Sequence, residues 1–301
     1  MSEIVRPVLE FKKKVQSVLN FFKRSIIFDI GFSIIALFII LSLAEPVINS
    51  YILKGQGVLK SGTFEKYLPP SPEHPLGTDH YGRDVLALLL ASLKNSLLIG
   101  AISGGLATLI GVVVAMAAGY FGGKIDEVLN GVTNTVLVIP SLPILIAVAA
   151  YTRLNLILMC IVLSIFSWPA SARVIRAQIL SLKERPYIDL AKVTGFNSFE
   201  IMFKEILPNI APFIGMGLTN AIIGAIFAET GIRLLGLGPG EIPSLGLMIN
   251  WALAFGALSL GHYHILLSPA ITLILLFTSL SLINIGMEEI FNPRLKKITG
   301  I

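Results

Sequence analysis

The sequence predicts an all-α membrane protein with six transmembrane helices. Hydrophobic residues make up 54% of the 301 residues and charged residues only 14%, whereas soluble domains carry about 25% charged residues. The mean hydropathy is +0.83. Six apolar stretches approach or exceed the roughly 20 residues that cross a bilayer. A chain this poor in charge has neither the polar surface of a soluble domain nor the composition of a disordered one.

The expected transmembrane region covers residues 26–290, and the six stretches are 26–48, 96–120, 128–151, 154–172, 210–232 and 265–287. An external loop is expected at 49–95 and a cytoplasmic loop at 183–208. Residues 1–25 repeat apolar residues every three to four positions opposite lysines. This pattern predicts an amphipathic cytoplasmic helix that lies on membrane lipid or on a partner subunit. Residues 291–301 are expected to form a cytoplasmic tail.

The positive charges predict which side of the membrane each loop occupies. If the N-terminus is cytoplasmic, 16 of the 23 Lys and Arg residues fall in cytoplasmic segments. The positive-inside rule therefore favours an N-in, C-in topology. Anchoring against anionic lipid then accounts for the basic pI near 9.3. Nucleic-acid binding is not expected, because no basic patch is interleaved with aromatic residues.

Two of the predicted spans contain residues that break helices. Pro140, Ser141 and Pro143 lie near the middle of the third span, and Trp168 precedes a proline in the fourth. Proline removes a helix hydrogen bond and clashes with the preceding turn. Freed backbone carbonyls are tolerated at membrane depth only against protein or a water-filled path. These residues are candidates for lining a translocation pathway, and a simple packing kink is the alternative.

Glu229 is the acid placed deepest in the predicted membrane region. Such groups are costly in a bilayer and face protein or water. Arg233 stands four residues further along the same helix face. We therefore expect a structural ion pair near the outer mouth, with a proton relay as the alternative, and Glu229 is also a candidate pathway residue.

The cytoplasmic loop at 183–208 predicts two short helices joined by a turn. Pro186 can open the first, since its missing N–H is not needed there, and Gly195 stands where a left-handed residue would end it. Asn197 and Glu200 have the spacing of a capping box for the second. Pro208 is expected to stop that helix. Apolar faces on a cytoplasmic loop indicate a protein partner.

The same loop resembles the EAA loop of ABC-importer permeases. The acid, the alanine, the glycine and the Leu-Pro pair stand at the family's spacing at Asp189, Leu190, Ala191, Gly195, Leu207 and Pro208. Aspartate replaces the usual glutamate, Leu190 an alanine, and Glu205 holds the usual isoleucine position. Only the last of these changes alters the chemistry of an expected contact.

A second motif, in the external loop, is similar to the signature of the second, C-type subunit of the dipeptide and oligopeptide permeases. Its residues are His74, Gly77, Thr78, Asp79, Gly82, Arg83 and Asp84. His74 is expected to buttress the loop, and Thr78 or Asp79 to cap the following helix. Further matches run in order from about residue 26 to 297 and cover nearly the whole chain.

The resemblance implies the type I permease fold of an ABC importer in the cell membrane. It implies a heterodimer with a homologous permease, two cytoplasmic subunits that bind ATP and magnesium, and an extracellular substrate-binding protein. The residues that would contact an ATPase are Tyr187, Asp189, Leu190, Ala191, Gly195, Phe199, Glu205, Leu207 and Pro208. The chain itself has no P-loop, so no cofactor is expected in it. Peptides are the expected substrate, with oligosaccharides or nickel complexes as alternatives.

Three other functions agree less well with the sequence. An autonomous secondary transporter or channel would explain the spans but not an ATPase-docking loop. A membrane hydrolase would need a nucleophile beside a base, and spans two to five contain no histidine. His262 and His264 lack the further ligands that a zinc site needs, so no metal site and no enzymatic activity are expected.

Overall fold

The computed structural model describes residues 25–291, and within this range it contains helices and no strand. The helices are α2 (Ile26–Leu53), α3 (Val85–Phe121), α4 (Gly123–Val138), α5 (Ser141–Tyr151), α6 (Leu156–Lys183), α7 (Pro186–Val193), α8 (Ser198–Glu200), the π-helical turn η1 (Ile201–Ile206), α9 (Leu207–Leu234), α10 (Leu245–Ala254) and α11 (Tyr263–Phe291). The predicted amphipathic segment and cytoplasmic tail lie almost entirely outside the described residues.

Five helices of the described part are long and apolar enough to cross a membrane: α2, α3, α6, the continuous run Ser198–Leu234 and α11. The third predicted span is a pair of helices, α4 and α5, whose axes differ by 75°. The break lies at the predicted place, because Pro140 precedes α5 and Pro143 stands in its first turn, where a missing N–H costs nothing. Counting this pair as one span gives six. The number of crossings and the orientation stay predictions.

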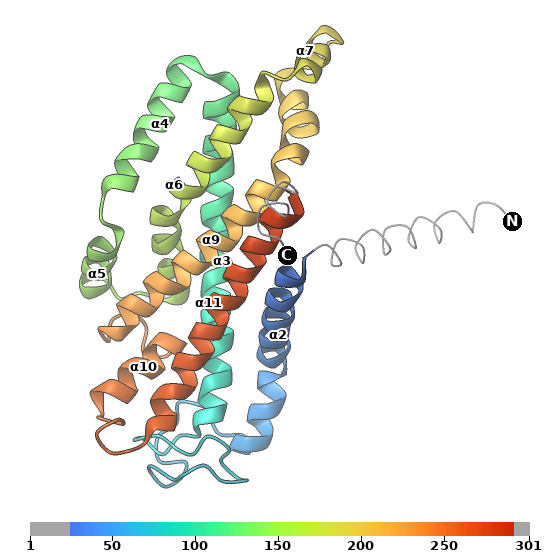
Figure 1. Cartoon of the computed structure of the whole chain (residues 1–301). Helices are drawn as coiled ribbons and strands as arrows, with labels where there is room; N and C mark the ends of the chain where they lie inside the picture. Colours follow the sequence, from blue (N-terminus) through green and yellow to red (C-terminus); the bar gives the residue numbers. More distant parts are fainter. Residues whose placement is uncertain (1–24, 292–301) are drawn as a thin grey trace, which may run out of the picture.

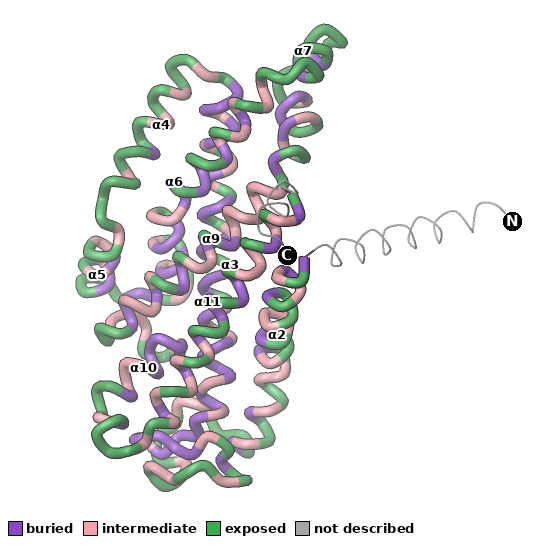
Figure 2. The backbone as a smooth tube through the Cα atoms, viewed as in Figure 1, coloured by how far each residue is buried: buried purple, intermediate pink, exposed green. Residues whose placement is uncertain are grey.

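Helix α3 forms the centre of the bundle and packs against α2, α6 and α9 (Figure 1). Small residues allow these close approaches. A Cβ added at Gly104 would lie 2.8 Å from the backbone N of Ile222 on α9, and one added at Gly111 would lie 3.1 Å from the backbone O of Trp168 on α6. Figure 2 shows buried backbone along much of α3, whereas α4 is mostly exposed.

The outer connection is shorter than predicted. It runs from residue 54 to 84, because α2 continues to Leu53 and α3 begins at Val85. In the sequence, Lys94 and Asn95 interrupt the apolar residues, so the second span was expected to begin after them. In the structure, both side chains have partners within the chain. The ammonium of Lys94 lies 3.0 Å from the carboxylate of Glu45 on α2, and the amide of Asn95 donates to the carbonyl of Pro243.

Two prolines were expected to interrupt helices and do not. Pro208 does not stop the second cytoplasmic helix, because α8, η1 and α9 form one continuous run from Ser198 to Leu234. The wider π turn, in which the N–H of Leu207 donates to the carbonyl of Met202, precedes the proline and accommodates its ring. Helix α6 likewise continues through Pro169.

The two motif-bearing loops lie at opposite ends of the bundle (Figure 1). Helix α7 projects at the top of the view, and the connection 54–84 lies at the bottom with α10. Helix α2 ends where the connection at 54–84 begins, and α11 starts on the same side of the bundle, so their other ends, at Ile26 and Phe291, are directed toward the side of α7 (Figure 1).

Candidate coupling surface and transport groove

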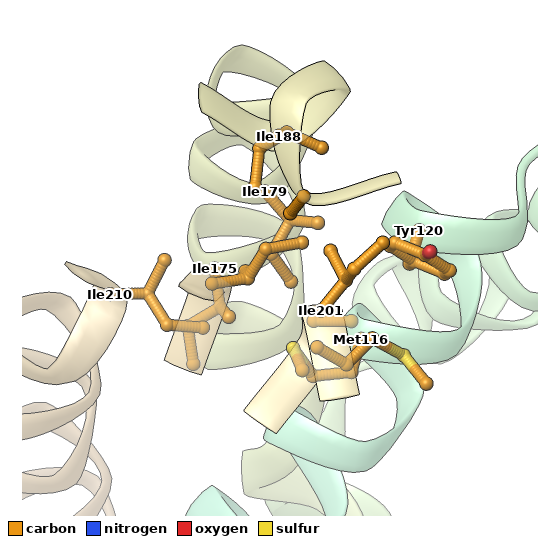
Figure 3. Packing of buried hydrophobic residues seen from close by; sticks show 11 residues of the cluster. Met116, Tyr120, Ile175, Ile179, Ile188, Ile201 and Ile210 are labelled. Carbon is orange, nitrogen blue, oxygen red and sulfur yellow. The ribbon is translucent and has the colours of Figure 1, made fainter. Parts of the chain in front are cut away.

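The loop at 183–208 rests on a buried apolar cluster that fixes it to three long helices (Figure 3). Ile188 of α7 and Ile201 of η1 are 0% and 1% exposed, and they pack with Ile175 and Ile179 of α6 and Met116 of α3. The full cluster is Ala115, Met116, Tyr120, Ile175, Ile179, Ile188, Ala191, Ile201, Met202, Ile206 and Ile210. Because protein interiors are close-packed, the loop is coupled mechanically to α3, α6 and α9.

The opposite side of this loop carries large apolar side chains that face outward. We call Leu190, Val193, Phe199 and Phe203 the coupling surface; they are between 61% and 86% exposed. An exposed apolar patch of this kind marks a protein interaction site. Val193 and Phe203 were not among the residues predicted to contact an ATPase. The helical spacing from Leu190 to Val193 and from Phe199 to Phe203 was the available signal.

The predicted turn between the two short helices is confirmed. Pro186 opens α7, and Gly195 has φ +90° directly after it, a conformation that costs a residue with a Cβ about 1–2 kcal/mol. The side chain of Asn197 accepts from the N–H of Glu200 at 2.9 Å, and the Glu200 carboxylate accepts from the N–H of Asn197 at 3.1 Å. These two bonds form the expected capping box.

The remaining predicted coupling residues divide between the two sides of the loop. Ala191 is buried in the cluster, and Leu207 packs against it. Asp189 is exposed and pairs with Lys192 at 2.8 Å. Tyr187 and Pro208 are exposed and Glu205 is half-buried. Of the predicted coupling residues, Leu190 and Phe199 therefore present the largest exposed apolar side chains.

The external-loop motif is built around a buried ion pair between Asp79 and Arg83. The guanidinium Nη2 lies 2.6 Å from Asp79 Oδ2, and both side chains are at most 4% exposed. The other carboxylate oxygen accepts from the backbone N–H groups of Tyr81 and Arg83, each at 2.9 Å. The guanidinium also lies over the ring of Trp251, 4.1 Å from its centroid. The pair therefore ties the loop to α10.

The N-cap of α3 is Asp84, not Thr78 or Asp79 as the sequence suggested. Asp84 Oδ1 accepts from the N–H of Ala87 at 2.8 Å, and Oδ2 lies 2.7 Å from His74 Nδ1. His74 thus buttresses the loop as expected. The Thr78 hydroxyl donates to the carbonyl of Glu65 and accepts from the N–H of Leu68, which holds the loop closed upon itself.

Glycine is required at the turn of this motif. Gly82 has φ +71°, and an added Cβ would collide with the carbonyl of Phe64.

The histidine of the same turn, His80, is buried against an aromatic ring. His80 stacks on Phe255, with 3.7 Å between ring centroids. Burial lowers the pKa of His80 from 6.5 to about 4. Asp79 opposes this shift, and Arg83 and Lys66 add to it.

The two other outer histidines make aromatic contacts. The ring of His262 stacks on Tyr67 at 4.5 Å, and His264 lies 6.0 Å from His262, edge to face. Within residues 25–291, no group of three or more His, Cys, Asp or Glu side chains is arranged to hold a metal ion.

A cavity of about 760 Å³ lies between α6, α9 and α11. Its size is in the range of small-molecule sites, about 300–1,000 Å³. Most of its lining is apolar, with a few polar groups. The lining residues are Phe166, Ser167, Ala170, Ser171, Val174, Phe213, Met216, Gly217, Asn220, Ala221, Gly224, Glu288 and Phe291. We call this cavity the groove.

The five predicted pathway residues lie outside the lining of the groove. Trp168 is buried against Ala107 and Ala221, while its neighbour Ser167 lines the groove. Glu229 is completely buried and pairs with Arg233 at 3.2 Å, as expected for a structural pair. Pro140, Ser141 and Pro143 stand at the break between α4 and α5.

Sequence reasoning missed the polar residues of the groove. Asn220 on α9 lines it, and the amide of Asn284 on α11 donates to the Asn220 side-chain oxygen at 2.9 Å. Glu288 lies one turn beyond Asn284 on α11 and also lines the groove. Polar residues inside apolar spans were a usable signal, but their convergence depends on how three helices are rotated.

Comparison with known proteins identifies the family. Residues 107–297 match the family described as the binding-protein-dependent transport system inner membrane component. The oligopeptide transport system permease protein OppC of Lactococcus lactis subsp. cremoris is 36% identical over 68% of this chain and 71% of its own length.

Two further relatives extend the comparison. The dipeptide transport system permease protein DppC of Bacillus subtilis is 30% identical over 87% of this chain and 81% of its own length. The glutathione transport system permease protein GsiD of Pectobacterium atrosepticum is 29% identical over 75% of each chain. The chain therefore belongs to the family of inner membrane components of binding-protein-dependent transport systems.

Proposed function

We propose that this chain is a permease subunit of an ABC importer for peptides, and that the groove is its half of the translocation pathway. The observation that carries the proposal is the groove itself. It gathers Ser167, Ser171, Asn220 and Glu288 in one place on helices that are otherwise strongly apolar. Polar and charged groups at membrane depth are costly unless they face water, protein or a substrate.

Peptides suit this lining. Amide groups such as that of Asn220 donate and accept hydrogen bonds, as peptide bonds do, and the aromatic rings of Phe166 and Phe213 can cover apolar side chains. The names of the relatives add oligopeptides, dipeptides and glutathione as the transported compounds. A second, homologous permease would close the open side of the groove.

The coupling surface provides the site for the energy source. Two partner subunits would bind ATP and magnesium, and one would contact Leu190, Val193, Phe199 and Phe203. The packed cluster beneath these residues would transmit the motion of the ATPase to α3, α6 and α9, whose movement exposes the groove to alternate sides. An external substrate-binding protein would deliver the peptide at the end formed by α10 and residues 54–84.

The groove can be tested by cysteine chemistry, since the native Cys160 is buried. In the complete importer reconstituted in proteoliposomes, Asn220→Cys should react with a water-soluble maleimide, and ATP-driven peptide uptake should then fall. Leu109→Cys is the matched control, because Leu109 is exposed on the surface of α3 away from the groove. A lipid-facing thiol does not ionise and should not react.

Three results would overturn the proposal. The first is equal reaction at both cysteines, or inhibition by Leu109→Cys alone. The second is ATP-dependent uptake of oligosaccharides with none of peptides. The third is peptide uptake by the purified chain without ATPases, which would indicate an autonomous carrier.

A further inference from the structure

We propose that Glu288 is a binding site for the cationic side chains of the transported peptide. It lies at the end of the groove formed by the C-terminal turn of α11. This inference rests on the proposed function and adds a chemical preference to it, namely for lysine or arginine side chains. The groove lining contains one charged residue among the described residues, and that residue is Glu288.

The carboxylate of Glu288 is available for a ligand. Within residues 25–291 it makes no ion pair and accepts no hydrogen bond, and the residue is exposed toward the groove. A carboxylate in an apolar groove needs water or a cation to offset its desolvation.

Helix α11 gives Glu288 no cationic neighbour. Glu288 lies in the last turn of α11, which contains no basic residue. A carboxylate without a basic neighbour in its own turn attracts a cation. The faces of Phe166 and Phe213 elsewhere in the lining are also favourable to cations.

The adjacent residue provides a comparison within the same turn. Glu289 points away from the groove lining and accepts from the hydroxyl of Ser25, the N-cap of α2, at 2.6 Å. One acid thus joins two helices, and its neighbour is left facing the groove. Removing either charge changes the net charge of the chain equally, so Glu289→Gln is a matched control for Glu288→Gln.

The test uses the complete importer in proteoliposomes with its binding protein outside and ATP inside. The probes are the pentapeptide Ala-Ala-Lys-Ala-Ala and the same peptide with an Nε-acetylated lysine, which has similar size and no side-chain charge. The measured quantity is the ratio of their uptake rates. Because the binding protein is the same throughout, changes in this ratio report on the permease.

Glu288→Gln should lower the ratio by about fivefold, as expected for loss of one partly screened charge interaction. Glu288→Asp should retain most of the preference, and Glu289→Gln should leave the ratio unchanged, since glutamine still accepts from Ser25. An unchanged ratio in Glu288→Gln, or an equal fall in both Gln variants, would overturn the inference while uptake itself continued. Absence of ATP-dependent uptake of either peptide by the unaltered importer would instead overturn the proposed function.

Discussion

The two sequence motifs of this chain use their residues in opposite ways. In the external loop, the side chains of Asp79, Arg83 and Asp84 are buried and find their partners within the chain. In the coupling loop, the side chains of Leu190 and Phe199 are exposed and are left uncovered by the described residues. The first motif therefore builds a rigid outer cap on the bundle, and the second presents a surface that a partner must cover.

A family motif therefore does not by itself identify a binding site. A buried charge is tolerated only when it is paired and hydrogen-bonded, so the outer motif is explained by folding alone. An exposed apolar side chain on the coupling loop does not stabilise the fold of this chain. Burial, rather than similarity to a pattern, separates the two roles.

The largest effect is expected from breaking the outer ion pair. Asp79→Ala leaves the buried Arg83 guanidinium without its carboxylate and should destabilise the chain by about 3–5 kcal/mol. Asp189→Ala removes an acid from an exposed pair with Lys192 in the coupling loop and should cost less than about 1 kcal/mol. Thermal unfolding of both variants in the same detergent measures the contrast. Equal shifts would remove the distinction between the two regions.

Acidification should also act on the outer cap. The unfolded state binds a proton at His80 below pH 6.5, whereas the folded state does so only near pH 4. Stability is therefore lost as the pH falls from 6.5 toward 4, by about 1.4 kcal/mol per unit and about 3 kcal/mol in all. Above pH 7 this contribution is constant.

The control for this pH dependence is His80→Phe, which keeps an aromatic ring against Phe255 but cannot take up a proton. Its unfolding temperature, followed from pH 8 to pH 5, should lack the part of the slope that His80 supplies. The same slope in the unaltered chain and in the variant would show that another group is responsible.

The spans could be predicted because a bilayer accepts only long apolar helices, and the break at Pro140 followed from the covalent structure of proline. The capping box at Asn197 was equally local. The end of the outer loop was missed because Lys94 is neutralised by Glu45, 49 residues away in sequence. Pro208 was misjudged because a π turn, which no pattern indicated, precedes it.

The groove shows where sequence reasoning ends for the candidate site. Ser167, Asn220 and Glu288 stand on three different helices, and only the rotation of each helix about its axis brings them together. Trp168 illustrates the same point, because it lies in the core, whereas Ser167, one position earlier in the sequence, lines the groove. The residues of the coupling surface lie close together in the sequence, so Leu190 and Phe199 could be named from it, and their contact with an ATPase stays a prediction.

The most direct test of the central claim compares two leucines of similar exposure, one on the coupling surface and one at the end of α9. Leu190 on the coupling surface is 63% exposed and Leu235 at the end of α9 is 59% exposed. Each is changed to serine in a tagged chain, which is purified from its native membranes in mild detergent and analysed by mass spectrometry for P-loop ATPases. Leu190→Ser should reduce the recovered ATPase at least about tenfold, as for a central interface residue. Leu235→Ser should recover it as the unaltered chain does. Full recovery with Leu190→Ser, or no ATPase with the unaltered chain, would contradict the account.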